Sequence, residues 1–196
     1  MKSSSPFSVR NICYISVFTA IIAVCAQISI PMPTGVPLTL QTFAIPLAGI
    51  ILGSKKGTLS VLIYIILGIS GIPVFTGFRG GIGVIFGVTG GYIISFPLMA
   101  LCAGIASDLP DKFKKFKKPI NSWVKNIIYA SGLILGAVIN YICGMFWGKF
   151  ILECSLSEAF IGFVLPYIPT AVVKIILTGI IGASVKNILN KNNILN

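Results

Sequence analysis

The sequence contains no histidine and very few acidic residues. Only four of its 196 residues are Asp or Glu, against 15 Lys and Arg. The five cysteines show no C-x-x-C spacing, which argues against a zinc site or a disulfide framework. Asp108, Asp111, Glu153 and Glu158 all lie outside the long apolar runs. An intramembrane hydrolase or a proton-coupled transporter would need acids within those runs, so we expect no enzyme and no cofactor.

Long polar stretches are also scarce, because 56% of the residues are apolar and only 10% are charged. Soluble domains of this size do not have that composition. The sequence therefore predicts an all-α integral membrane protein, a compact bundle of six transmembrane helices that forms a single domain over residues 1–196. The expected spans are residues 12–30, 37–52, 58–72, 82–106, 127–150 and 169–188.

The positive charges are distributed unevenly between the two ends of this arrangement. If the N-terminus is cytoplasmic, 12 of the cations fall on the cytoplasmic side, Arg79 and Lys149 fall outside, and Lys174 lies within the last span. The positive-inside rule then places both termini in the cytoplasm of a multi-pass protein of the cell membrane. The basic run at 110–119 is accounted for by this orientation, since cytoplasmic loops normally carry such an excess, although binding of anionic lipid or of a partner protein is an alternative.

The segment 71–92 is unusually rich in glycine and lies between apolar runs. Glycine suits places where the backbone turns sharply or is closely approached, and it offers lipid little surface. We expect a packed re-entrant or capping loop rather than a membrane span, with a simple turn as the alternative. The loop 31–37 and the connection before the last span fall on the same outer side. Together the three segments would form a pocket with a lid that opens to the exterior.

Lys174 is the only charged residue within a predicted span, and such a charge usually faces the bundle interior. With Arg79 it indicates an anionic ligand, for instance a carboxylate, taken from outside. The alternative for Lys174 is a side chain that reaches the outer headgroups. Six uncharged polar residues lie near the same level. They either contribute to a mostly apolar pocket or form hydrogen bonds between neighbouring helices: Gln27, Gln41, Thr89, Tyr92, Asn140 and Tyr167.

Small residues recur every four positions in two spans. Ser16 and Ala20 share one face of the first span, and a longer ladder in the fifth span consists of Gly132, Gly136, Asn140, Gly144 and Gly148. Such faces dock either a neighbouring helix or a partner protein, and for the fifth span we favour internal packing. No stretch has the P-loop spacing. A binding protein without a visible energy source implies an energising partner.

Four blocks of sequence resemble the BioY family, the biotin-binding S-components of energy-coupling factor (ECF) transporters. They are PLTLQT at 37–42, LGISGIPVF at 67–75, RGGIG at 79–83 and GVTGGY at 87–92. The resemblance covers essentially the whole chain in matching order. It implies a six-helix protein that captures biotin from outside beneath the loops 31–37 and 71–81. The residues then expected beside the ligand are Gln41, Phe75, Arg79, Gly80, Gly81, Thr89, Tyr92, Asn140, Tyr167 and Lys174.

The resemblance also implies partners, namely two cytoplasmic ATPases and a transmembrane coupling protein that docks on Ser16 and Ala20. One departure concerns the start of the last span, where the family commonly has Asp and Lys in contact with the ligand. Here Lys174 is kept and Ala171 replaces the acid. Either another group compensates or the preferred ligand is another vitamin or small carboxylate. A membrane scaffold subunit is an alternative of a different class, and Val88 at a usual proline position is a milder departure.

Overall fold

The structure is a computed structural model that describes residues 8–115 and 121–192. Five helices in it are long and apolar enough to cross a membrane. The lysines at positions 2, 117 and 118, which contributed to the predicted orientation, lie outside the described residues. The elements in chain order are α1 (Val9–Gln27), β1 (Ser29–Ile30), β2 (Leu38–Thr39), α2 (Gln41–Ile69), η1 (Ile82–Val84), α3 (Gly90–Lys115), α4 (Ser122–Leu152), α5 (Leu156–Phe163), η2 (Leu165–Tyr167) and α6 (Ile168–Lys191).

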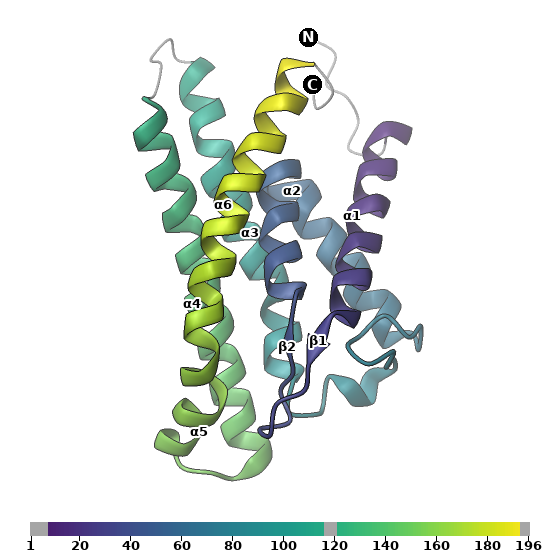
Figure 1. Cartoon of the computed structure of the whole chain (residues 1–196). Helices are drawn as coiled ribbons and strands as arrows, with labels where there is room; N and C mark the ends of the chain where they lie inside the picture. The colour runs from purple at the N-terminus through teal and green to yellow at the C-terminus, as the bar shows by residue number, and fades with distance from the viewer. Residues whose placement is uncertain (1–7, 116–120, 193–196) are drawn as a thin grey trace.

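The long element α2 folds back on itself at Gly53. This glycine has φ 82° and ψ 176°, which is not helical and which side chains other than hydrogen rarely allow. A Cβ added to Gly57 would lie 2.7 Å from the Cα of Gly49. In a straight helix these two residues are about 12 Å apart along the axis. The sequence predicted two spans in this region, and the structure shows two helical arms joined by a tight turn (Figure 1).

Glycines allow α2 and α3 to pack backbone against backbone, the most extensive helix contact of the fold. A Cβ on Gly49 would collide with the carbonyl oxygen of Ala100 and lie 3.0 Å from the backbone nitrogen of Gly104. A Cβ on Gly104 would in turn collide with the backbone of Ser54. The turn itself is closed by α3, because the Asp108 carboxylate accepts hydrogen bonds from the Ser54 amide (3.0 Å) and hydroxyl (2.6 Å).

The glycine ladder of α4 packs inside the protein, which confirms the interpretation favoured from the sequence. Cβ atoms added to its glycines would collide with neighbouring segments or contact them tightly. The collisions are Gly132 with Ala106, Gly144 with Tyr92 and Gly148 with Phe163, and a Cβ on Gly136 would lie 3.0 Å from the carbonyl oxygen of Met99. The ladder thus brings α3 and the end of α5 close to α4. This packing positions Asn140, the polar member of the ladder, against α3.

The two ends of the bundle differ in structure and in charge (Figure 1). One end holds the Gly53 turn, the start of α1 and the end of α6, and there Lys186 pairs with Asp111 at 2.9 Å. The other end holds the β1–β2 hairpin, the segment between α2 and α3, and α5. The three irregular segments that the sequence assigned to one side therefore do lie at one end.

Several predicted boundaries are wrong in detail. The second span begins at Gln41 rather than Pro37, because residues 38–39 pair with residues 29–30 as a short antiparallel hairpin. The fourth span begins at Gly90 rather than Ile82, and its helix continues to Lys115 through part of the polar segment. The connection before the last span contains a helix, α5, which starts at a capping box between Ser155 and Glu158. Proline-rich and capped segments conceal such short elements from periodicity analysis.

Candidate functional site

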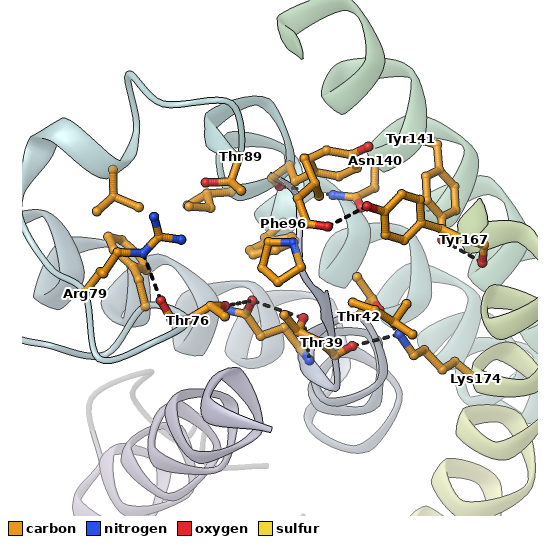
Figure 2. Close-up of a pocket in the computed structure, with 18 residues that line it drawn as sticks. Thr39, Thr42, Thr76, Arg79, Thr89, Phe96, Asn140, Tyr141, Tyr167 and Lys174 are labelled. Atoms are coloured by element: carbon orange, nitrogen blue, oxygen red, sulfur yellow. Dashed lines mark hydrogen bonds between the residues drawn. The ribbon is translucent and has the colours of Figure 1, made fainter. Parts of the chain in front are cut away.

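A pocket lies at the hairpin end of the bundle, where segments far apart in the sequence converge (Figure 2). It contains about 620 Å³ of empty space, counting its open mouth. The walls are mainly aromatic and aliphatic, with a few polar groups. The lining residues are Val36, Pro37, Leu38, Thr39, Gln41, Thr42, Phe75, Thr76, Arg79, Val84, Thr89, Tyr92, Ile93, Phe96, Asn140, Tyr141, Tyr167 and Lys174.

Lys174 extends from α6 to the wall formed by β2 and the first turn of α2. Its ammonium donates to the carbonyl oxygen of Thr39 at 2.7 Å and to the hydroxyl of Thr42 at 3.0 Å. Within the described residues, no carboxylate lies at ion-pairing distance from this ammonium. A half-buried positive charge without a counter-ion favours a ligand that brings negative charge or a strong acceptor.

Gln41 is the centre of a buried polar network at the floor of the pocket. Its side-chain amide donates to the Tyr64 hydroxyl, and its side-chain oxygen accepts from the hydroxyls of Thr39 and Thr76, both at 3.2 Å. Tyr64 in turn donates to the carbonyl oxygen of Val74 at 3.2 Å. The network fixes the hairpin and the 70–81 segment to the same point of α2, so the pocket floor is ordered before a ligand arrives.

The segment 70–81 is a structured loop that covers one side of the pocket. Phe75 and Arg79 pair through backbone hydrogen bonds, and the Phe75 ring fills the space that a Cβ on Gly68 would occupy. Figure 2 shows Arg79 on the side of the pocket away from Lys174. Arg79 uses its Nε to donate to the carbonyl oxygen of Thr76 at 3.1 Å, and it is exposed. The prediction of a packed capping loop agrees with this arrangement.

Gln27, at the end of α1, holds this loop through three backbone groups. Its amide nitrogen donates to the carbonyl oxygens of Val74 and Phe75, both at 3.2 Å, and its side-chain oxygen accepts from the Phe78 amide at 2.9 Å. Replacing Gln27 by leucine leaves these groups without their partner and should raise the open population of the loop about ten-fold. We expect trypsin to cut after the exposed Arg79 about ten-fold faster in Gln27→Leu.

The matched control for this cleavage is Ser70→Ala, because the Ser70 hydroxyl bonds only within its own helix, to Ile66. Time courses of limited proteolysis in detergent, read by mass spectrometry of the fragments, provide the measurement. Equal cleavage rates at Arg79 in Gln27→Leu and wild type would contradict the role given to Gln27.

The opposite wall is formed by α3, α4 and the start of α6. Asn140 donates both of its amide protons, to the carbonyl oxygen of Tyr92 at 3.1 Å and to the Ser95 hydroxyl at 2.8 Å. This fixes the orientation of its amide and leaves the side-chain oxygen as an acceptor. Tyr167 donates to the carbonyl oxygen of Val36 and lies 3.0 Å from the Thr34 hydroxyl, so it ties the hairpin to α6.

The structure brings most of the predicted site residues together. Eight of them line the pocket: Gln41, Phe75, Arg79, Thr89, Tyr92, Asn140, Tyr167 and Lys174. Gly80 and Gly81 do not line it. A Cβ on Gly80 would collide with the backbone of Ile72 and Gly71, and Gly81 has φ 93°, so both shape the loop instead. Gln27 also acts on the loop from outside the pocket.

Sequence reasoning missed several polar and aromatic lining residues. Thr39 and Thr42 belong to the PLTLQT block but were not singled out, although they are the groups that hold the Lys174 ammonium. Thr76, Phe96 and Tyr141 also line the pocket. Only their positions could have indicated them, since Thr76 and Tyr141 directly follow Phe75 and Asn140, and Phe96 is about one helical turn after Tyr92.

Ser16 and Ala20 are exposed on α1, on the face turned away from the core. The buried face of the same helix carries Ile15, Thr19 and Ile22, and Thr19 donates to the carbonyl oxygen of Ser60 at 3.0 Å. The small-residue pair is therefore not used for packing among the described residues, and the flat strip it forms is available to lipid or to another protein.

The fold and the pocket together define a multi-pass membrane protein that binds a small molecule between its helices, with no catalytic constellation among the described residues. The family model of the BioY family matches residues 1–191. The chain belongs to the BioY family, whose members are transport proteins and not enzymes.

Similar proteins are known from distant organisms. The chain is 40% identical over 166 residues to a probable biotin transporter BioY of Pyrococcus horikoshii, covering 84% of this chain and 89% of that protein. It is 34% identical over 179 residues to the biotin transporter BioY of Thermotoga maritima, covering 91% and 97%. A solved structure, the S-component for biotin from an ECF-type ABC transporter, has a TM-score of 0.78 and 29% identity, covering 94% of each chain.

Proposed function

We propose that this chain, acting as one domain over residues 1–196, captures biotin from outside the cell as the S-component of an ECF-type transporter. The observation that carries the proposal is the Lys174 ammonium, which has no carboxylate partner among the described residues and lies in a mostly apolar pocket. The names of the similar proteins identify biotin as the ligand class to test first.

Biotin would lie lengthwise between Lys174 and Arg79, which stand on opposite sides of the pocket (Figure 2). Its neutral ureido ring suits the inner side, where Lys174 donates to the ureido oxygen. Its carboxylate suits the exposed Arg79, because a charge that keeps part of its water has a smaller desolvation cost. Phe75, Phe96 and Tyr141 would pack against the apolar middle of the ligand.

The side-chain oxygen of Asn140 offers a replacement for the acid that Ala171 lacks. Ala171 lines a small recess next to the pocket, together with Asn140 and Lys174. Asn140→Leu removes the acceptor for a ureido N–H and should weaken biotin binding about ten-fold. Adding Ala171→Asp to Asn140→Leu should restore part of the affinity, since a carboxylate then stands beside Lys174. Calorimetric titration of wild type, the single variants and the double variant measures this, and unchanged affinity in Asn140→Leu would contradict it.

The test of the function itself is a titration of the purified protein with biotin by calorimetry and by thermal unfolding. A capture protein shows sub-micromolar binding and a rise in melting temperature. If a folded, monodisperse sample shows neither binding nor stabilisation, the protein does not bind biotin. A panel of other vitamins and small carboxylates then identifies the ligand. Absence of stabilisation by every compound would favour a scaffold subunit.

We further propose that the chain crosses the membrane six times with both ends in the cytoplasm. The two arms of α2 account for the sixth crossing, since the Gly53 turn reverses the chain. Arg10, Lys56 and Lys186 gather at the turn end, which supports that end as the cytoplasmic one. Reporter fusions after residue 55 and at both ends should all report the cytoplasm.

Two cytoplasmic ATPases and a transmembrane coupling protein would energise uptake, and the strip of Ser16 and Ala20 is our proposed contact for the coupling protein. Ser16→Leu with Ala20→Leu places bulk on the exposed strip and should reduce co-purification with the coupling protein at least ten-fold, because close approach in lipid requires small residues. Biotin binding should not change. The control is Ile142→Phe on the exposed side of α4, and equal co-purification of both variants would contradict the contact.

A further inference from the structure

A second, larger hollow lies between α4 and α6, away from the pocket. It is an open groove with about 900 Å³ of empty space, counting its open side. Its floor is formed by Tyr129 and Leu133, both 2% exposed, while Ile176 and Ile180 stand exposed at its rim. The lining residues are Asn126, Tyr129, Ala130, Leu133, Ile175, Ile176, Gly179, Ile180, Ala183, Ser184 and Asn187.

The lining of the groove is polar at one end and apolar along the rest, as a phospholipid molecule is. Its polar lining residues, among them Asn126 and Asn187, gather near one end, and the remainder toward Ile175 is apolar. The span from Ile175 to Asn187 corresponds to about 18 Å of helix. One leaflet of the hydrocarbon core is about 15 Å thick. The groove therefore runs from headgroup level to about the middle of the membrane.

The polar end also carries positive charge. Lys125 donates to the side-chain oxygen of Asn187 at 2.7 Å, and its ammonium lies 5.4 Å from the centre of the Tyr129 ring. These contacts hold the charge at the mouth of the groove. The nearby Lys186 is engaged differently, because it is buried and paired with Asp111. Lys125 therefore places a positive charge where an anionic headgroup would lie.

We propose that this groove binds one anionic phospholipid, with an acyl chain between α4 and α6 and its phosphate at Lys125, Asn126 and Asn187. The site stands independently of the biotin assignment. The segment that contains α6 is the least buried of the candidate spans, and α6 carries Lys174 nearer its other end. A lipid chain in the groove supplies the packing that this helix lacks and supports the helix that presents Lys174.

Native mass spectrometry of the whole chain in mild detergent tests the proposal, with phosphatidylglycerol and phosphatidylcholine of identical acyl chains as probes. Wild type should retain one phosphatidylglycerol, favoured about five-fold over phosphatidylcholine. Gly179→Leu should retain neither, because leucine fills the groove. A Cβ at Gly179 would lie 3.7 Å from Leu133, an ordinary contact, so the variant should fold. Ala183→Leu is a second filling variant.

Two controls distinguish the contribution of the headgroup from that of the acyl chain, and binding in the groove from binding elsewhere on the surface. Lys125→Gln should keep lipid binding but lose the preference for phosphatidylglycerol. Ile181→Phe, on an exposed position of α6 outside the groove, should behave as wild type. Thermal unfolding should show added phosphatidylglycerol stabilising wild type but not Gly179→Leu. Any of three outcomes would overturn the proposal. They are equal lipid retention in wild type and both filling variants, the absence of a headgroup preference, and a two-copy species that Gly179→Leu abolishes.

Discussion

Lys174→Ala should weaken the binding of biotin and of its uncharged amide equally, by about 100-fold. The ammonium is half-buried and already fixed by Thr39 and Thr42, so it meets the ureido oxygen without further ordering. A hydrogen bond from a charged donor contributes about 1.5–3 kcal/mol, and the ligand oxygen would be left without its donor in the variant. Since the ureido group is the same in both compounds, both should lose the same free energy.

Arg79→Ala should act on biotin alone, weakening it about ten-fold and leaving the amide unchanged, because Arg79 faces the carboxylate in our arrangement. Lys149→Ala, a lysine of α4 outside the pocket, is the control for a general loss of positive charge. Calorimetry of biotin and its amide with wild type and the three variants gives the binding free energies for this comparison. If Lys174→Ala removed the difference in affinity between biotin and its amide, the ligand would lie in the opposite direction in the pocket. If it changed neither affinity, Lys174 would not contact the ligand.

Gly49→Val should prevent the protein from folding stably. Its Cβ would collide with the carbonyl oxygen of Ala100 and approach the backbone of Gly104, and backbone cannot move aside as a flexible side chain can. Overpacking of a close-packed core typically costs about 1–3 kcal/mol, and a helix contact through backbone is at the upper end or beyond. We expect a large loss of monodisperse protein on size exclusion and a melting temperature lower by about 5 °C or more.

Gly179→Ala is the matched control for this prediction, because the added Cβ meets only Leu133, at 3.7 Å. It should express and melt as wild type does. A Gly49→Val variant with the same melting temperature would show that α2 and α3 can separate freely, which contradicts the packing described here.

The sequence predicted the class of protein and the converging segments, because both depend on local composition. Apolar length identified the helices, and the charge asymmetry grouped the irregular segments at one end. The reversal of α2 was also predictable, since Gly53 is followed by Ser54, Lys55 and Lys56 between two apolar runs. Lys174 was recognisable as a candidate pocket residue, because a charged side chain within a span usually faces the bundle interior.

The partners of these residues were not predictable, because they depend on contacts between distant segments. Lys174 meets Thr39 across 135 positions, and Tyr167 meets Val36 across 131. Periodicity also gave no sign of the two-residue strands that place Thr39 in the wall. Gly80 and Gly81 shape the loop without lining the pocket, and a glycine needed for loop geometry looks the same in sequence as one needed for close approach by a ligand.

The start of α6 holds the hairpin at two points, through Tyr167 to Val36 and through Lys174 to Thr39. A tilt of α6 as a rigid body therefore strains these two contacts, because the Gln41 network also holds the hairpin to α2. The hairpin wall of the pocket and one of its main ligand-facing groups are thus coupled. The rate at which ligand escapes should follow the motion of this one helix, and substitutions that loosen α6 should shorten the lifetime of the complex more than they slow its formation.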